Sequence, residues 1–133
     1  MTEIPSNRNT DNARYDSVLR ANLFAEELHW VTGGGSGIGR CVAHELAALG
    51  ATVVISGRSA DKLERIAAEI REDGGRVETR AFDIRDEEQV RAAVASVVAA
   101  HGRIHGLVNN VGGQFPAPLQ SISKHGFEAV IAT

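Results

Sequence analysis

Short apolar runs alternate along the chain with longer stretches of helical periodicity. Thr52–Ile55 is an uninterrupted β-branched run, which is typical of a parallel strand buried on both faces. Leu28–Val31 and Ile104–Val108 are further apolar runs and predict two more strands. Arg76–Phe82 alternates polar and apolar residues, so it predicts a strand that is less buried than the second.

Apolar residues recur at helical spacing between these strands. One helix is expected over Gly37–Leu49, and a second is expected to begin at Ser59 or Asp61. A third is expected from Asp86, which forms a capping-box pattern with Gln89. The positions expected to face the core on these helices are Ile38, Val42, Leu46, Leu49, Leu63, Ile66, Ala67, Ile70, Val90, Val94, Val97 and Val98.

Strands that alternate with helices predict βαβ units and a parallel sheet. Right-handed crossovers then give the strand order 3-2-1-4 of a doubly wound, Rossmann-type α/β domain. Residues 1–20 lack an apolar period and predict a disordered or loosely attached tail, which leaves 21–133 as the domain. A last helix is expected from near Ser123, so the sheet is expected to be truncated after its fourth strand and the start of that helix.

Composition limits the number of domains and the kinds of partner that the chain can have. The 133 residues allow one domain, and the net charge of −3 gives no reason to expect nucleic acid or an anionic membrane as a partner. No apolar run is long enough to span a membrane, and the polar N-terminus does not resemble a secretory signal, so a cytoplasmic location is expected. The single cysteine, Cys41, is expected to be a small core residue, and the histidine spacing predicts no metal site.

A glycine-rich segment, Thr32–Gly39, joins the first strand to the first helix. A turn of this kind presents unpaired N–H groups and the positive end of a helix dipole, which together bind phosphate. Gly33 is expected to supply the tight turn, Gly37 to let the backbone approach a pyrophosphate, and Gly39 to let the helix pack close to the strand. No Lys-Ser or Lys-Thr follows the glycines, so a nucleoside-triphosphate loop is disfavoured.

The spacing Thr-Gly-x-x-x-Gly-x-Gly within Thr32–Gly39 resembles the glycine motif of the short-chain dehydrogenase/reductase family. A second block, Leu107–Gly112, resembles the Asn-Asn-Ala-Gly strand end of the same family, with Val111 in place of Ala. The resemblance covers roughly Leu23 to Thr133. It implies an oxidoreductase that transfers hydride between a nicotinamide cofactor and a ketone, an alcohol or an enoyl thioester, usually as a homodimer or homotetramer.

The end of the second strand indicates which cofactor is used. An acidic residue there would bind the ribose hydroxyls of NAD, but the chain has Ser56-Gly57-Arg58, and Arg58 can hold the 2′-phosphate of NADP. NADP(H) is therefore expected rather than NAD(H).

The resemblance also implies that Asp83 contacts the adenine amino group, with helix capping as the alternative role for Asp83. Asn109 is expected to tie neighbouring strands together, and Asn110 and Gly112 to lie beside the nicotinamide-side ribose. The full set of expected cofactor-binding residues is Thr32, Gly33, Gly35, Ser36, Gly37, Ile38, Gly39, Ser56, Arg58, Asp83, Ile84, Asn110 and Gly112.

The loop Gly112–Pro116 resembles that of 2-enoyl thioester reductases and related bacterial alcohol dehydrogenases. Gln114 and Phe115 would then lie over the nicotinamide and the substrate, although a proline-stiffened surface loop is an equal alternative.

The resemblance further implies a catalytic Ser, a helix Asn and a Tyr-x-x-x-Lys pair, none of which this sequence contains at a matching position; the single tyrosine is Tyr15. We therefore expect the chain to be the cofactor-binding half of an enzyme, inactive alone, and Leu107 and Val108 to form an exposed apolar edge. Two alternatives stay open: a non-catalytic dinucleotide-binding module that acts as a sensor or scaffold, and, less favoured, a methyltransferase with a similar sheet.

Overall fold

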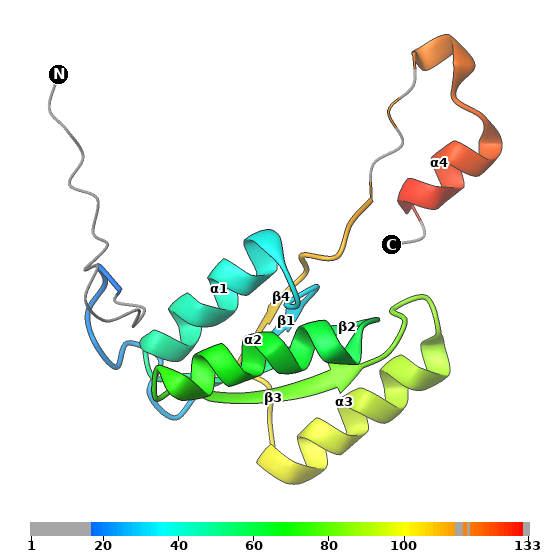
Figure 1. Ribbon diagram of the computed structural model, residues 1–133. Coiled ribbons are helices and arrows are strands. Elements are labelled where there is room, and N and C mark those ends of the chain that lie inside the picture. The colour runs from blue at the N-terminus through cyan, green and yellow to red at the C-terminus, as the bar shows by residue number, and fades with distance from the viewer. Residues whose placement is uncertain (1–16, 114–115, 117, 132–133) are drawn as a thin grey trace, which may run out of the picture.

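A four-stranded parallel sheet forms the centre of the computed structural model, which describes residues 17–113, 116 and 118–131 (Figure 1). The strands are β1 (Leu28–Thr32), β2 (Thr52–Gly57), β3 (Arg76–Ala81) and β4 (Gly106–Val108). They are arranged in the order β3-β2-β1-β4, and each neighbouring pair is parallel. The predicted α/β class and the predicted strand order 3-2-1-4 are both confirmed.

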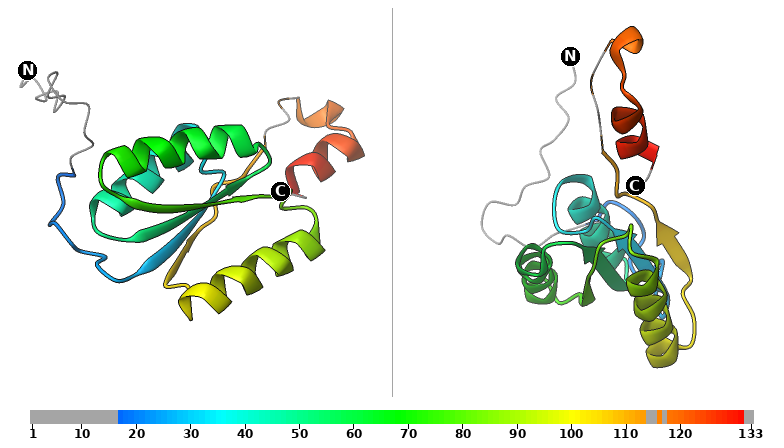
Figure 2. Two further views of the ribbon diagram at one scale, coloured as in Figure 1. Left: turned by 60° about the horizontal axis from the view of Figure 1, so that its bottom comes forward. Right: turned by 90° about the vertical axis from the view of Figure 1, so that its right-hand side faces the viewer.

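Helices cover both faces of the sheet. Helices α1 (Gly37–Ala48) and α2 (Ala60–Glu72) pack on one face, and α3 (Glu87–His101) packs on the other (Figure 2). After β4 the chain forms a short 3-10 turn, η1 (Leu119–Ser121), and then α4 (Lys124–Ile131), which stands away from the sheet (Figure 1). None of the helices in the described residues is both long enough and apolar enough to cross a bilayer.

Two apolar layers hold the sheet between its helices. The larger layer joins β2 to α1 and α2, and the smaller one joins β1 and β2 to α3. Val53, Val54 and Ile55 are each 0% exposed, so β2 is buried on both faces as predicted. The four residues predicted to be buried on α2 are all confirmed: Leu63, Ile66, Ala67 and Ile70.

The predicted core face of α1 is wrong in part. Ile38 is 76% exposed, and Val42 and Leu46 are only half-buried, whereas Leu49 is buried as expected. The helix begins so close to the glycine-rich turn that small side chains face the sheet instead of large ones. The buried residues within α1 are Gly39, Ala43, His44 and Ala47.

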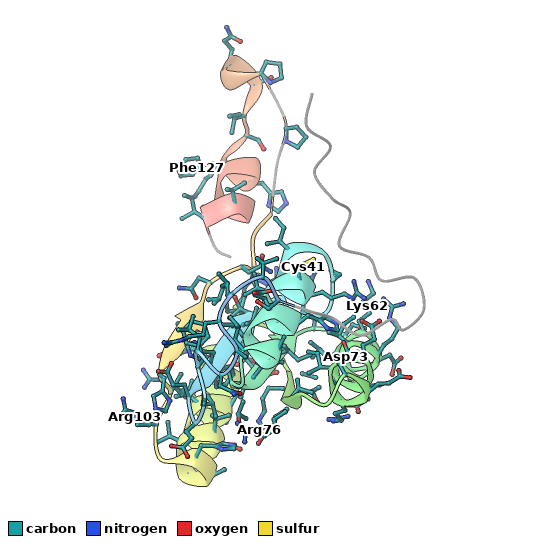
Figure 3. All side chains as sticks on the ribbon, turned by 90° about the vertical axis from the view of Figure 1, so that its left-hand side faces the viewer. Cys41, Lys62, Asp73, Arg76, Arg103 and Phe127 are labelled. Carbon is teal, nitrogen blue, oxygen red and sulfur yellow. The ribbon has the colours of Figure 1, made fainter. Side chains whose placement is uncertain are left out.

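The prediction that Cys41 belongs to the core is wrong, because Cys41 is exposed (Figure 3). His44, on the same helix, is buried. Its Nε2 lies 3.2 Å from a carboxylate oxygen of Glu69, and its Nδ1 lies 3.6 Å from one of Asp73. Both acids belong to the α2 segment, so this contact pins α1 against α2.

Helix α3 is less buried than its pattern predicts. Val97 is 0% exposed, but Val94 and Val98 are each 40% exposed, because α3 is the only helix of the described residues that packs on this face of the sheet. The predicted cap is confirmed: the Asp86 carboxylate accepts the backbone N–H of Gln89 at 3.1 Å.

The ends of the described chain bear on two further predictions. Most of the predicted tail lies outside the described residues, but the Ser17 hydroxyl donates to the carboxylate of Glu45 on α1, and Phe24 packs against the larger apolar layer. Strand β4 lies at the edge of the sheet, and its Leu107 is 59% exposed. The exposed apolar edge that the sequence predicts at Leu107 is therefore present.

Candidate functional site

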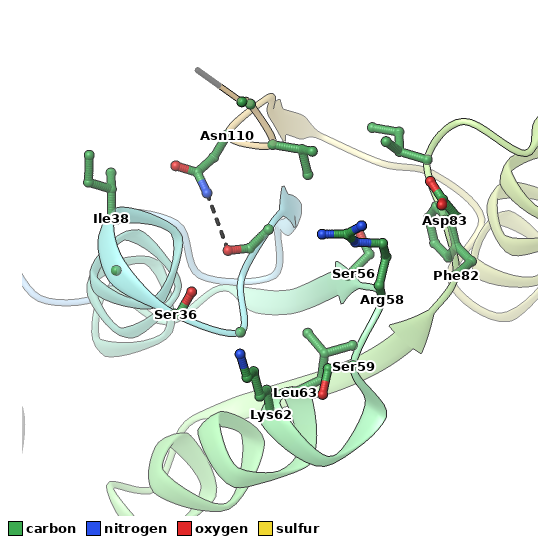
Figure 4. A pocket seen from close by; sticks show the side chains of 18 of the residues that line it. Ser36, Ile38, Ser56, Arg58, Ser59, Lys62, Leu63, Phe82, Asp83 and Asn110 are labelled. Atoms are coloured by element: carbon green, nitrogen blue, oxygen red, sulfur yellow. Dashed lines mark hydrogen bonds between the residues drawn. The ribbon is translucent and has the colours of Figure 1, made fainter. Parts of the chain in front are cut away.

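A pocket of about 790 Å³ opens at the carboxyl ends of the four strands (Figure 4). Its wall is formed by the glycine-rich turn after β1, the end of β2 with the start of α2, the residues after β3, and the residues after β4. This edge is where open α/β sheets bind their ligands. All the predicted cofactor-binding residues line the pocket except Thr32 and Gly39.

The glycine-rich turn is fixed over the end of β2 by backbone contacts. The N–H groups of Gly33 and Gly34 donate to the carbonyl oxygen of Ser56 at 2.8 and 3.2 Å. A Cβ on Gly39 would lie 2.3 Å from the carbonyl oxygen of Gly33, so the close packing of helix on turn requires glycine there. Gly37 has a φ of +54° and no atom within 4 Å of its missing Cβ, so its backbone faces open space.

The first turn of α1 is free to receive an anion. Its N-cap is Ser36, whose side chain forms no capping hydrogen bond, and the first turn contains no acidic residue. The first turn of α3, by contrast, contains Glu87 and Glu88 and is capped by Asp86. An uncapped helix N-terminus without nearby carboxylates favours negative charge, and that of α1 lies on the pocket wall.

Thr32 lies behind the turn and holds it in place. Thr32 is 6% exposed, and its hydroxyl donates to the carbonyl oxygen of Val108 at 3.2 Å. The same oxygen accepts the N–H groups of Asn110 at 2.9 Å and Val111 at 3.2 Å. The structure therefore gives Thr32 a positioning role between β1 and β4. Thr32 does not line the pocket, and its predicted contact with a cofactor stays a prediction.

Asn110, and not Asn109, ties the two strand ends together through its side chain. Its Nδ2 donates to the carbonyl oxygens of Thr32 at 3.1 Å and Gly33 at 3.2 Å, while Asn109 is exposed. Both asparagines follow the end of β4 at Val108, so the prediction that Asn109 ties the strands together is wrong by one residue. Asn110 still lines the pocket, as predicted.

Ser56 contributes backbone rather than a free side chain. It is 2% exposed, and its hydroxyl accepts the indole N–H of Trp30 at 2.9 Å. Its predicted contact with a cofactor stays a prediction, whereas Arg58, two residues further on, is exposed and extends into the pocket (Figure 4).

Asp83 is held as a carboxylate by its neighbour Arg85. The Arg85 side chain donates to both carboxylate oxygens, at 3.0 and 2.6 Å, and the Arg85 backbone N–H donates at 3.0 Å. These hydrogen bonds, with a smaller attraction from Arg58, hold the pKa of Asp83 well below its usual range. The cap of α3 is Asp86, so the alternative role of Asp83 as that cap is excluded.

Several pocket residues had no signal in the sequence. Leu63 and Phe82 are ordinary apolar residues of α2 and of the segment after β3, and only the fold places them on the wall. Ser59, Lys62 and Arg85 are polar but belong to no motif that we recognised; only their position just after strands β2 and β3 could have suggested them. Gln114, Phe115 and Tyr15 lie outside the described residues.

Comparison with known proteins identifies the family of this chain. A family model described as "short chain dehydrogenase" matches residues 28–133. The chain is 31% identical to a peroxisomal 2,4-dienoyl-CoA reductase of Danio rerio, with 98% of the chain and 45% of the relative covered. It is 36% identical to a gluconate 5-dehydrogenase of Gluconobacter oxydans, with 77% of the chain and 40% of the relative covered.

The chain is also similar to solved structures of dehydrogenases and oxidoreductases. A citronellol catabolism dehydrogenase of Pseudomonas aeruginosa PAO1 has 60% sequence identity and a TM-score of 0.83, over 90% of this chain and 48% of that one. A metagenomic short-chain oxidoreductase in complex with NADP has 38% identity and a TM-score of 0.75, over 81% of this chain and 49% of that one. The chain therefore spans less than half the length of these proteins.

Proposed function

The chain belongs to the short-chain dehydrogenase family, and we propose that it forms the cofactor-binding part of an NADP(H)-dependent oxidoreductase. The observation that carries this proposal is the placement of Arg58. It extends into the pocket opposite the uncapped first turn of α1, while the tip of β2 carries no carboxylate that would bind the ribose hydroxyls of NAD.

The shape of the pocket wall fits a dinucleotide. The turn presents backbone without side chains at Gly35 and Gly37, and the uncapped start of α1 would hold the diphosphate. The Asp83 carboxylate is a pure acceptor and would accept from the adenine amino group, with Ile84 beside the ring. Asn110 and Gly112 would face the nicotinamide-side ribose. When bound, the nicotinamide supplies the hydride or accepts it, and the residues named above orient it.

The local charge favours NADP(H) over NAD(H). Asp83 is a carboxylate within the pocket wall, but it is paired with Arg85, so it repels an added phosphate less than a bare carboxylate would. The guanidinium of Arg58 can bind such a phosphate with paired, charge-assisted hydrogen bonds. The NADP complex of a 38% identical protein supports this choice.

The substrate class that we propose is a small molecule: a ketone or alcohol, or an enoyl thioester. The relatives include a dienoyl-CoA reductase and a gluconate dehydrogenase by name, which supports hydride transfer to either kind of group and does not favour the non-catalytic module. We assign no general acid for such a reaction to the described residues that line the pocket. We further propose a homo-oligomeric, cytoplasmic parent enzyme.

Calorimetric titration with NADP⁺ and NAD⁺ tests the proposal. We expect NADP⁺ to bind at least about tenfold more tightly, since a charge-assisted hydrogen bond contributes roughly 1.5–3 kcal/mol. Arg58→Gln should weaken the binding of NADP⁺ much more than the binding of NAD⁺. Arg103→Gln, which changes an exposed residue outside the pocket wall, is the matched control. Equal binding of the two cofactors, or binding of S-adenosylmethionine in their place, would overturn the proposal.

A further inference from the structure

Two cations on the pocket wall, Arg58 and Lys62, are not held in a salt bridge within the part of the chain that the structure describes, although Arg58 weakly attracts the Asp83 carboxylate. Arg85, on the same wall, is paired with Asp83, and Arg40, in the first turns of α1, is paired with Glu69. Among the residues that the structure describes, Arg58 and Lys62 form neither an ion pair nor a side-chain hydrogen bond, although both line the pocket. Positive charge on a pocket wall that no salt bridge holds is available to attract an anionic group of a ligand.

Lys62 reaches this end of the pocket from α2. A Cβ on Gly35 would lie 3.4 Å from the Cβ of Lys62, so the lysine stem runs directly beside the glycine-rich turn. Figure 4 shows its ammonium group directed toward that turn, with Arg58 extending into the same opening from the end of β2. The next residue, Leu63, is 1% exposed, and it anchors the first turn of α2 so that Lys62 leaves the helix in a fixed direction.

We propose that Lys62 is a second ligand of the ribose 2′-phosphate of NADP(H) and a determinant of cofactor specificity. The inference rests on the function proposed above. A phosphate monoester carries about two negative charges at neutral pH, which one guanidinium alone does not balance. Arg58 can bind two phosphate oxygens through its planar fork, and the compact ammonium of Lys62 can bind the third from the side of the turn.

The chemistry that these cations recognise, a phosphate ester on an adenosine ribose, is not unique to NADP. Coenzyme A carries a phosphate on the neighbouring 3′-hydroxyl. The isomers 2′,5′-ADP and 3′,5′-ADP reproduce the two arrangements, and 5′-AMP lacks the extra phosphate altogether. The affinities of the full chain for 2′,5′-ADP, 3′,5′-ADP and 5′-AMP therefore show whether the site recognises the phosphate of NADP or that of coenzyme A.

Isothermal titration of the wild-type protein, Lys62→Gln and Lys62→Arg with these three nucleotides tests the inference. We expect Lys62→Gln to weaken the binding of 2′,5′-ADP about threefold to fivefold and to change the binding of 5′-AMP by less than about twofold. Lys62→Arg should retain most of the affinity. Arg65→Gln is the matched control, because Arg65 is an exposed cation of the same helix that does not line the pocket.

The outcomes separate this inference from the proposed function. Wild-type preference for 2′,5′-ADP over 5′-AMP with no greater loss in Lys62→Gln than in Arg65→Gln would overturn the role of Lys62 alone. No wild-type preference would overturn the NADP(H) assignment itself. Equal binding of 2′,5′-ADP and 3′,5′-ADP, weakened equally by Lys62→Gln, would overturn the assignment to the 2′-phosphate. Circular dichroism of each variant checks that the fold is kept.

Discussion

Thr32 and Asn110 hold each other by two hydrogen bonds at the ends of adjacent strands. The hydroxyl of Thr32 accepts the backbone N–H of Asn110 at 2.9 Å, and the Asn110 side chain donates to the carbonyl oxygen of Thr32 at 3.1 Å. Because Asn110 also donates to Gly33 at 3.2 Å, the pair fixes the glycine-rich turn relative to β4. The position of the pocket thus depends on Thr32, which lies behind the turn, and on Asn110, which lines the pocket.

Thr32→Val should destabilise the protein by about 1–3 kcal/mol. The change keeps the volume of the side chain but leaves the N–H groups of Asn110 and Val111 without the acceptor that they now share, and an unsatisfied buried donor carries a desolvation cost of that size. Urea denaturation followed by circular dichroism measures the effect. Thr32→Ser keeps the oxygen and should lose far less, so equal losses in the two variants would contradict this role of the hydroxyl.

Gly39→Ala should lower the free energy of unfolding by about 1–3 kcal/mol, the typical effect of overpacking. It should also weaken nucleotide binding. The added methyl carbon would lie 2.3 Å from the Gly33 carbonyl oxygen and 2.5 Å from Asn110 Nδ2, so the turn or the helix has to shift. Gly112→Ala is the control for stability, since a Cβ there meets no atom within 4 Å. Thermal unfolding of both variants shows the difference; a Gly39→Ala protein as stable as the wild type would rule out the close packing.

The sequence predicted the sheet and α2 well for a physical reason. In β2 and α2 the buried positions are large and apolar, so the pattern of large apolar residues and the pattern of burial coincide. In α1 they separate, because the buried positions are Gly39, Ala43, His44 and Ala47, while Ile38 is exposed at the pocket. The burial of His44 also depends on Glu69 and Asp73, which only the folded chain brings to it.

In the candidate site, too, the sequence predicts some residues, and only the fold reveals others. The glycine motif and the Ser56-Gly57-Arg58 strand end are local, so their contribution to the pocket could be read from spacing alone. The contribution of Lys62 depends on which way α2 leaves β2, and that is a property of the packing. The choice between Asn109 and Asn110 depends on a register of one residue, which no pattern at the end of a three-residue strand can specify.

Replacing isoleucines at two helix positions tests the corrected core assignment. Ile66 is 0% exposed. Ile66→Ala should lower the free energy of unfolding by about 2–5 kcal/mol, the usual range for a buried aliphatic residue. Ile38→Ala, at a position 76% exposed, should stay within about 0.5 kcal/mol of the wild type. Chemical denaturation of both variants measures the contrast, and a large loss at Ile38 would restore the original assignment of that residue to the core.

The Glu69 carboxylate should make stability depend on acid pH. Partial burial alone would raise the pKa of Glu69, but hydrogen bonds and attraction from Arg40 and His44 outweigh it and lower that pKa. A lowered pKa in the folded state means that the contribution is fully present above the unfolded value of about 4.5 and is lost as the pH falls through the folded value.

Melting temperatures at pH 7 and at pH 3 test this dependence. The advantage of the wild type over Glu69→Gln should be present at pH 7 and should shrink at pH 3. Glu72→Gln, at an exposed position of the same helix, serves as the control. A wild-type advantage that is as large at pH 3 as at pH 7 would show that the Glu69 side chain does not stabilise the protein through its charge.

Nitrogen-15 NMR of the labelled chain during titration with NADP⁺ tests the central claim most directly, because it locates the cofactor. We predict that the amide signals of Gly35, Gly37, Arg58, Ile84 and Gly112 shift, while those of residues at the opposite end of the sheet, such as Gly74 and Gly102, stay in place. Shifts confined to that opposite end, or no shifts at all, would contradict the assignment of the pocket as the NADP(H) site.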